Sequence, residues 1–253
     1  MRMSFRIAIA GKGGVGKSTI AALLIRALHE RSGKVIMAVD ADPNSNLGEK
    51  LGMKVEHTIG ELREDLLKNA DNIPAGQSKQ EYVELQMKLA TVEGEGIDLL
   101  TMGRQEGPGC YCYINNILRT FLDMAMDEYD YVVIDNEAGM EHLSRRTTKR
   151  MDLMIILADP TKVGLETALR IKSLASSMGV EVGATALIVN QIKAPLGPEL
   201  RGIIEKGNFD RTFTLPFDVE VEEFAIRGRS LHELHGSDTL YLQVKELVAT
   251  LVR

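Results

Sequence analysis

A glycine-rich segment constrains the fold of this chain more than any other feature of its sequence. The segment reads Gly11-Lys12-Gly13-Gly14-Val15-Gly16-Lys17-Ser18-Thr19, which fits the phosphate-binding pattern G-x-x-x-x-G-K-[ST] at every fixed position. The glycines allow successive backbone N–H groups to curve around a β-phosphate without a side-chain clash. Lys17 can neutralise the β- and γ-phosphate oxygens, and the Ser18 hydroxyl can bind Mg²⁺. We therefore expect the whole segment 11–19 to contribute to a nucleotide site.

The residues on either side of the loop predict a strand before it and a helix after it. An apolar run at 5–10 precedes the loop and predicts a buried strand, whereas 20–28 follows it with the apolar spacing of a helix. The loop would thus join a strand to a helix whose N-terminus receives the phosphate.

Apolar runs alternate with helical stretches along the rest of the chain. The further runs lie at 34–39, 97–102, 131–134, 153–158, 185–189 and 211–215. Continuous apolar runs separated by helices are typical of strands buried on both faces of a parallel sheet. Residues 68–96 are polar and weakly patterned, which predicts an excursion of helix and loop. We expect one α/β domain over 1–253, with a mostly parallel twisted sheet of about seven to eight strands flanked by helices.

Composition narrows the classes of function. The net charge of −6 and the pI near 5.5 disfavour a general nucleic-acid binder, which usually needs a basic face. No apolar run reaches the roughly 18 residues of a membrane-spanning helix, and the first strand begins too early to leave room for a signal peptide. The two cysteines do not form a secreted disulfide framework. We expect a cytoplasmic protein with no nucleic-acid partner and no stable membrane association.

Carboxylates follow two of the predicted strands. Asp40 and Asp42 come after the second strand, and two carboxylates beside a phosphate-binding loop suit Mg²⁺ hydration and the positioning of water. A simple Asp-Pro turn is the alternative for this pair. Asp135 ends the strand at 131–134 and can hold Mg²⁺ through water. Glu137 adds a further carboxylate whose role stays open.

The two cysteines form a Cys-x-Cys pair. Cys110 and Cys112 directly precede a helical pattern at 114–122, and the start of a helix lowers the pKa of a thiol and favours the metal-binding thiolate. Two thiolates cannot complete a tetrahedral site, but a homodimer with this loop at its axis would supply four. The alternatives are two small packing residues or a redox pair.

Segment 11–19 resembles the deviant Walker A motif, KGGVGK[ST], of the SIMIBI class of P-loop ATPases. This class includes the nitrogenase iron protein, the septum-positioning ATPase MinD, the partition ATPase ParA and metal-centre maturation ATPases. The resemblance implies that Lys12 reaches across a homodimer interface to the nucleotide of the partner. The alternative is a solvated loop lysine.

The same resemblance implies roles for the other candidate residues. It implies Mg²⁺-dependent hydrolysis of ATP to ADP and phosphate, with Lys12, Lys17 and Asp42 as catalytic residues. Asp42 would orient the attacking water, whereas Ser18, Asp40 and Asp135 would serve the magnesium site. For the base, it implies that Asn190 reads the edge of adenine and that the segment beginning at Pro216 closes over it.

Two further segments narrow the resemblance. Residues 107–112 read Gly-Pro-Gly-Cys-Tyr-Cys, and 135–142 read Asp-Asn-Glu-Ala-Gly-Met-Glu-His. With 11–19 and the chain length, they are similar to the CooC family of carbon monoxide dehydrogenase maturation ATPases and to its AcsF relatives, which act on acetyl-CoA synthase. The similarity runs from residue 6 to the C-terminus. It implies a homodimer, induced by ATP or metal, that assists nickel insertion into one of these client enzymes, with Cys110 and Cys112 of two subunits sharing one Ni²⁺ or Zn²⁺.

Two other functions of the class stay open. A positioning switch of the MinD or ParA kind would need a basic amphipathic C-terminal helix, whereas 240–253 is amphipathic but barely basic, so we expect it to pack on the protein body. An electron donor like the nitrogenase iron protein would have cluster cysteines well separated in sequence. The sequence leaves open the metal, the client, whether ATP drives capture or release, and the roles of Glu137 and His142.

Overall fold

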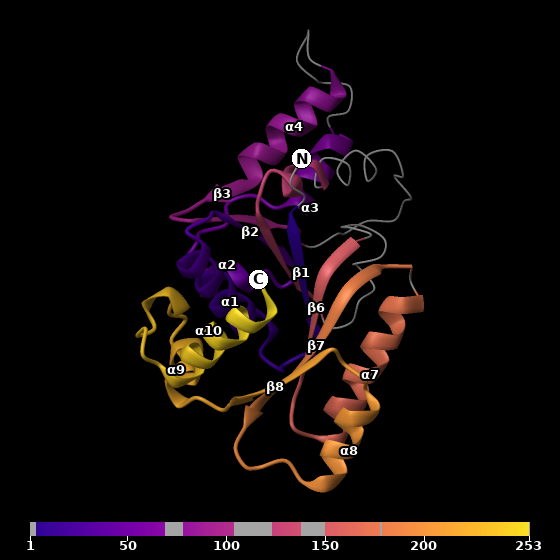
Figure 1. Ribbon diagram of the computed structural model, residues 1–253. Helices are drawn as coiled ribbons and strands as arrows, with labels where there is room; N and C mark the ends of the chain where they lie inside the picture. The colour runs from indigo at the N-terminus through magenta and orange to yellow at the C-terminus, as the bar shows by residue number, and fades with distance from the viewer. Residues whose placement is uncertain (1–3, 69–77, 104–122, 138–149, 178, 253) are drawn as a thin grey trace.

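An eight-stranded sheet forms the centre of the molecule (Figure 1). The structure is a computed structural model that describes residues 4–68, 78–103, 123–137, 150–177 and 179–252. The strand order is β3-β4-β2-β5-β1-β6-β7-β8. The strands are β1 (Phe5–Gly11), β2 (Ile36–Ala41), β3 (Thr91–Glu93), β4 (Ile97–Thr101), β5 (Tyr131–Asn136), β6 (Arg150–Ala158), β7 (Glu181–Ile192) and β8 (Arg211–Pro216).

The pairing of the strands confirms the expected α/β fold. β3 runs antiparallel to β4, and the other neighbouring pairs are parallel. The apolar runs of the sequence predict every strand except β3, whose three residues are too few to show a pattern. β3 follows α4 (Lys79–Ala90), so the described part of the predicted excursion at 68–96 forms a helix and an edge strand.

Helices cover both faces of the sheet (Figure 1). One face carries α1 (Lys17–Ser32), α2 (Leu47–Leu51), α9 (Val219–Ile226), α10 (Thr239–Leu251) and the short η1 (Leu231–Glu233). The other face carries α3 (Ile59–Lys68), α4, α7 (Lys162–Ser177) and α8 (Pro198–Lys206). Because side chains alternate along a strand, Ile7 and Ile9 of β1 pack toward α1, whereas Ala8 and Ala10 pack toward the opposite layer.

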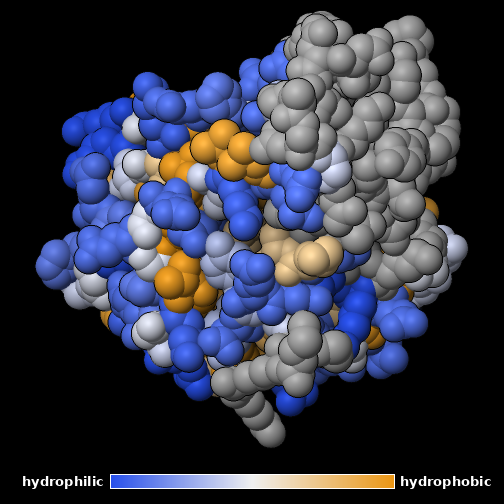
Figure 2. All heavy atoms as spheres, turned by 90° about the horizontal axis from the view of Figure 1, so that it is seen from above, coloured by the Kyte–Doolittle hydropathy of each residue, from blue (hydrophilic) through white to orange (hydrophobic). Residues whose placement is uncertain are grey.

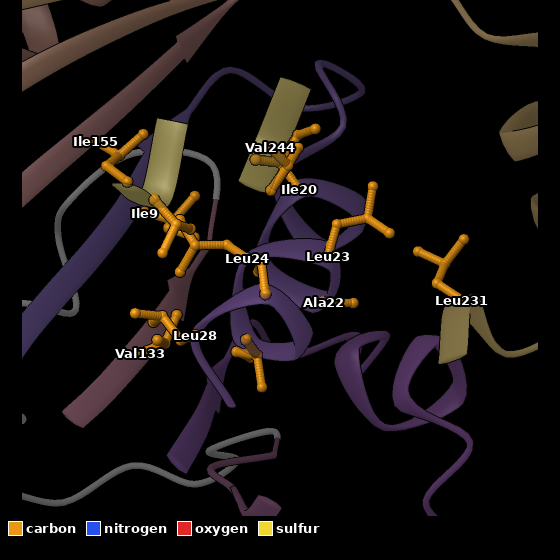
Figure 3. Packing of buried hydrophobic residues seen from close by; sticks show 14 of the residues in the cluster. Ile9, Ile20, Ala22, Leu23, Leu24, Leu28, Val133, Ile155, Leu231 and Val244 are labelled. Atoms are coloured by element: carbon orange, nitrogen blue, oxygen red, sulfur yellow. The ribbon is translucent and has the colours of Figure 1, made fainter. Parts of the chain in front are cut away.

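The C-terminal helix α10 packs against α1, as expected from the sequence. Its residues Tyr241 and Val244 are fully buried, and Figure 3 shows Val244 beside Ile20 of α1. The Arg26 guanidinium lies 4.2 Å from the centre of the Tyr241 ring, and Lys245 Nζ lies 3.0 Å from a Glu30 carboxylate oxygen. The apolar face of α10 therefore belongs to the core.

One face of the molecule is mainly polar where its residues are described. The face seen in Figure 2 is dominated by hydrophilic side chains, with smaller hydrophobic groups between them. Within the described ranges, every helix is too short or too polar to cross a membrane.

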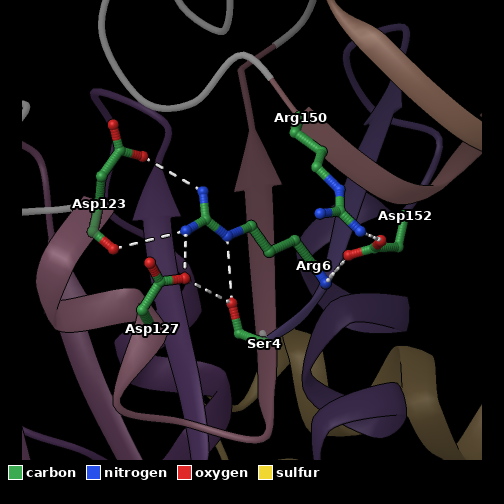
Figure 4. Close-up of polar contacts among 6 residues, drawn as sticks. All are labelled: Ser4, Arg6, Asp123, Asp127, Arg150 and Asp152. Atoms are coloured by element: carbon green, nitrogen blue, oxygen red, sulfur yellow. Dashed lines mark hydrogen bonds and ion pairs between the residues drawn. The ribbon is translucent and has the colours of Figure 1, made fainter. Parts of the chain in front are cut away.

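A cluster of charged residues joins three chain segments at the amino ends of β1 and β6 (Figure 4). The Arg6 guanidinium donates to Asp127 at 2.7 Å and to Asp123 at 3.2 Å, both in a helical segment at 123–127. The Arg6 backbone N–H donates to Asp152 of β6 at 2.9 Å, and Arg150 donates to the other oxygen of Asp152. The cluster thus connects the amino ends of β1 and β6, which lie at the end of the sheet opposite the glycine-rich loop.

We predict that Arg6→Met lowers the free energy of unfolding by about 1–2 kcal/mol, because two half-exposed carboxylates lose their hydrogen-bonded cation. Urea unfolding measures the change. Lys54→Met is the matched control, because Lys54 and Glu56 form an exposed surface ion pair whose loss should cost less than about 0.5 kcal/mol. Equal effects of the two substitutions would contradict a structural role for the cluster.

Candidate nucleotide-binding site

The glycine-rich loop connects β1 to α1, as the sequence predicts. Gly11 ends β1 so close to β6 that a Cβ would lie 2.6 Å from the Leu157 carbonyl oxygen. Gly16 precedes α1 with φ 91°, a left-handed conformation that glycine adopts without strain, and no side chain caps the helix. The N–H groups of the first turn therefore face the loop, where they can bind phosphate.

The two lysines of the loop lie in different environments. Lys17 begins α1 and is buried, and its Nζ lies 3.4 Å from the carbonyl oxygen of Lys12. The Lys12 side chain is exposed. This exposure suits the predicted contact with a partner subunit, which stays a prediction because the structure contains one chain.

Asp135 and Asp40 lie side by side at the carboxyl edge of the sheet. They are partners in the parallel register of β5 and β2, and both side chains are fully buried. Neither oxygen of Asp135 has a well-formed hydrogen bond, although the nearby Ser18 hydroxyl partly offsets the effect of burial. Burial raises the pKa of Asp135 to about 7. A buried carboxylate that lacks a well-formed hydrogen bond is suited to a cation, so Asp135 and Ser18 together fit the predicted Mg²⁺ site.

Asp40 differs from Asp135 because its oxygens have partners. One oxygen accepts the N–H of Asp42 at 3.1 Å, and the other accepts the N–H of Leu47 at 2.9 Å. Burial raises the pKa of Asp40 to about 6, and these two N–H groups oppose the rise. Asp40 thus holds both ends of the loop that carries Asp42, and its predicted role at magnesium stays a prediction.

Asp42 forms a local turn at the rim of the site. Its carboxylate accepts both the backbone N–H and the side-chain amide of Asn44 at 2.9 Å. The side chain is partly exposed, which leaves it accessible to water near the loop. The structure therefore shows the local turn at Asp42, and the catalytic role of this residue stays a prediction.

The candidates for base binding lie at the carboxyl ends of β7 and β8. Asn190 is 5% exposed, and its amide donates to the Val15 carbonyl oxygen at 2.9 Å. Pro216 is partly buried and pairs in register with Ile192 of β7. Their predicted contacts with adenine stay predictions, but the structure does bring Asn190 to the phosphate-binding loop.

Asn136 is a structural residue that the sequence motif did not identify. Its side-chain amide is buried and donates to the carbonyl oxygen of Ile9 at 2.9 Å, which fastens the end of β5 to β1. Its position directly after Asp135, at the end of an apolar run, was the available signal. Glu137 follows with a partly exposed side chain.

Some sequence-predicted residues lie outside the described ranges. These are Cys110, Cys112 and His142. Within the residues that the structure does describe, no three histidine, cysteine or acidic side chains form a metal-binding group. The predicted Ni²⁺ or Zn²⁺ site therefore stays a prediction from sequence.

Comparisons with known proteins agree on an ATP-binding protein. A family model described as AAA domain matches residues 5–177. An uncharacterised ATP-binding protein of Methanocaldococcus jannaschii is 41% identical over 248 residues, which cover 97% of this chain and 98% of that protein. The carbon monoxide dehydrogenase accessory protein CooC of Rhodospirillum rubrum is 32% identical over 241 residues, with 90% of each chain covered. The crystal structure of the Pyrococcus furiosus cell division ATPase MinD shares the fold, with a TM-score of 0.69 at 18% identity over 99% of this chain and 100% of that one.

We predict that Asp135→Asn stabilises the nucleotide-free protein at pH 8 in the absence of Mg²⁺. The pKa of about 7 lies above the ordinary value of 3.8, so ionisation favours the unfolded chain, and stability is lost as pH rises through 7. Removing the charge should raise the free energy of unfolding by at least about 1 kcal/mol. Urea unfolding in EDTA measures it.

The matched control for this prediction is Asp152→Asn. The Asp152 carboxylate accepts hydrogen bonds from the Arg6 N–H and from Arg150, so its neutralisation should lower stability instead. A destabilised Asp135→Asn protein would contradict an unpaired buried charge at that position.

Proposed function

The chain belongs to the AAA-domain family of ATP-binding P-loop proteins, and from this membership we propose that it is a homodimeric, Mg²⁺-dependent ATPase that assists nickel insertion. Its client is carbon monoxide dehydrogenase or acetyl-CoA synthase. The observation that carries the proposal is the 32% identity to the accessory protein CooC, which extends over 90% of both chains and so beyond the nucleotide-binding loop. The Cys-x-Cys pair at 110–112 supplies the soft ligands that a nickel carrier needs.

The geometry of the described residues supports ATP hydrolysis in such a protein. In this proposal the first turn of α1 and Lys17 would bind the phosphates, and Asp135 with Ser18 would hold Mg²⁺, which would supply positive charge at the phosphates. Asp42, at the partly exposed rim, orients the attacking water, and the exposed Lys12 reaches the nucleotide of the partner subunit. Asn190 and Pro216 flank the adenine, and the whole range 1–253 acts as a single domain.

Nickel is the cargo in this proposal. Cys110 and Cys112 of two subunits provide four thiolates around one Ni²⁺ or Zn²⁺, which a tetrahedral site requires. Dimerisation in the presence of nucleotide would assemble this site, and dissociation of the dimer would open it. The protein acts in the cytoplasm, where its client enzymes mature.

A positioning ATPase of the MinD or ParA kind is the main alternative. The solved MinD structure shares the fold of this chain, but an identity of 18% is too low to support a shared function. The main apolar face of α10 is buried against α1, with Tyr241 and Val244 fully buried and Leu242 alone among its large apolar side chains exposed, so this helix does not present the broad apolar face that a membrane-binding helix needs. The iron-protein alternative predicts a coloured iron–sulfur protein, and an absorption spectrum of the purified dimer distinguishes it.

We predict that Lys12→Ala retains ADP binding but loses dimerisation in ATP and nearly all hydrolysis, because the partner nucleotide loses its trans cation. Loss of such a charge costs about 10²-fold or more in turnover. Size-exclusion chromatography in ATP and phosphate release measure the two effects. Lys54→Ala, an exposed lysine on the same polypeptide, should behave as wild type. Normal dimerisation and turnover of the Lys12 variant would refute the trans role.

We predict that wild-type dimer binds one Ni²⁺ or Zn²⁺, and that the double variant Cys110→Ser/Cys112→Ser binds none while retaining ATP. Serine hydroxyls do not form the thiolates that hold these ions. Binding should weaken at acidic pH as thiolates are protonated. Metal analysis after gel filtration, with nucleotide binding as the internal control, measures the result. Full nickel loading of carbon monoxide dehydrogenase by the double variant would refute the metallochaperone proposal.

A further inference from the structure

Two neighbouring amides at the end of β7 contact the phosphate-binding loop. Asn190 Nδ2 donates to the carbonyl oxygen of Val15 at 2.9 Å, and Gln191 Nε2 lies 3.5 Å from the carbonyl oxygen of Gly14. Asn190 is buried, whereas Gln191 is partly buried. The loop is thus attached from outside its own strand and helix by a segment about 175 residues farther along the chain.

An irregularity in β7 allows both amides to reach the same loop. Successive side chains of a regular strand point to opposite faces of the sheet. The register between β7 and β8 shifts between Val189 and Ile192, and Gln191 has φ 60°, a left-handed conformation that non-glycine residues rarely adopt. Such irregularities re-aim side chains and often lie beside active sites. The backbone of β7 is therefore distorted at the two residues that contact the loop.

These contacts determine which way the loop N–H groups point. In a trans peptide, the carbonyl of one residue and the N–H of the next point in opposite directions. A Val15 carbonyl that faces Asn190 turns the Gly16 N–H away from β7, and a Gly14 carbonyl that faces Gln191 does the same for the Val15 N–H. These N–H groups belong to the part of the loop that curves around a β-phosphate.

The packing at Gly16 shows how closely the loop fits against the amide. A Cβ on Gly16 would lie 2.7 Å from Asn190 Nδ2, which is shorter than a tolerable contact. Glycine at this position is therefore required both by its φ of 91° and by the presence of Asn190.

We propose that Asn190 and Gln191 are positioning residues that orient the phosphate-binding loop before a nucleotide arrives. This role is distinct from reading adenine, because it acts on the phosphates and applies to ligands without a base. The inference rests on nucleotide binding, one part of the proposed function, and is independent of nickel insertion.

The test compares a ligand that has a base with one that lacks it. Titration calorimetry with Mg-ADP and with magnesium pyrophosphate is carried out on the wild type, Asn190→Ala and Gln191→Ala. Asn190→Ala should weaken both ligands by about tenfold, because it leaves the Val15 carbonyl without its partner. Gln191→Ala should weaken both by about threefold, because its contact is longer and more exposed.

Two control variants separate positioning from general damage. Gln243→Ala on α10 removes an amide away from the loop and should leave both affinities unchanged. Gln191→Asn introduces a residue that tolerates positive φ and has a shorter side chain, so the affinities of this variant should fall as those of Gln191→Ala do. This second variant also tests the inference if Asn190→Ala does not fold.

The outcomes distinguish the inference from the proposed function. Weaker ADP binding with unchanged pyrophosphate binding in the Asn190 and Gln191 variants would overturn positioning and leave base reading. A wild-type protein that binds ADP but not pyrophosphate would also overturn it, because a loop oriented by the protein binds phosphate without a base. Failure of the wild type to bind either ligand would overturn nucleotide binding and this inference together.

Discussion

The orientation of a few backbone N–H groups at the end of β1 is the constraint on which the rest of this structure depends. They must converge on one phosphate, so the chain has to leave a buried central strand, turn through glycines and enter α1 at once. β1 lies between β5 and β6. Asn136 of β5 donates a hydrogen bond to β1 itself, and Asn190 of β7 donates one to the loop that follows β1. The sheet thus acts as a rigid frame for a loop that has no regular structure of its own.

The same edge of the sheet concentrates charge that is unfavourable for folding. Asp40 and Asp135 are buried beside each other, and burial raises the pKa of both. Asp40 recovers two backbone hydrogen bonds, whereas Asp135 has none that are well formed. The opposite edge has paired charges instead, where Arg6 joins two aspartates. The amino ends of the strands thus have paired charges, whereas the carboxyl ends carry buried carboxylates whose ionisation opposes folding.

Much of the fold and of the site's location could be predicted from sequence, because apolar runs and the glycine-rich motif are local signals. The rule that parallel sheets bind ligands at their carboxyl ends places Asp40, Asp135 and Asn190 at the same edge. The partners of these side chains could not be predicted. The hydrogen bonds of Asp40 depend on the path of its loop, and the contact of Gln191 depends on a strand irregularity that no residue pattern encodes. The aspartates bound by Arg6 lie 117 to 146 residues away, a separation that a local pattern cannot bridge.

The packing of α10 on α1 has a consequence for how the protein is made. Glu30 and Lys245, which join the two helices, are 215 residues apart, so a ribosome completes α1 long before its cover exists. During that interval the side of α1 that will pack on α10, which includes Ile20 beside Val244 in Figure 3, lacks its cover, and an isolated helix of this length is only marginally stable. The packing that stabilises α1 is therefore completed only when the C-terminal helix has been synthesised. Until then the apolar surface of the unfinished chain is available for aggregation and for binding by chaperones.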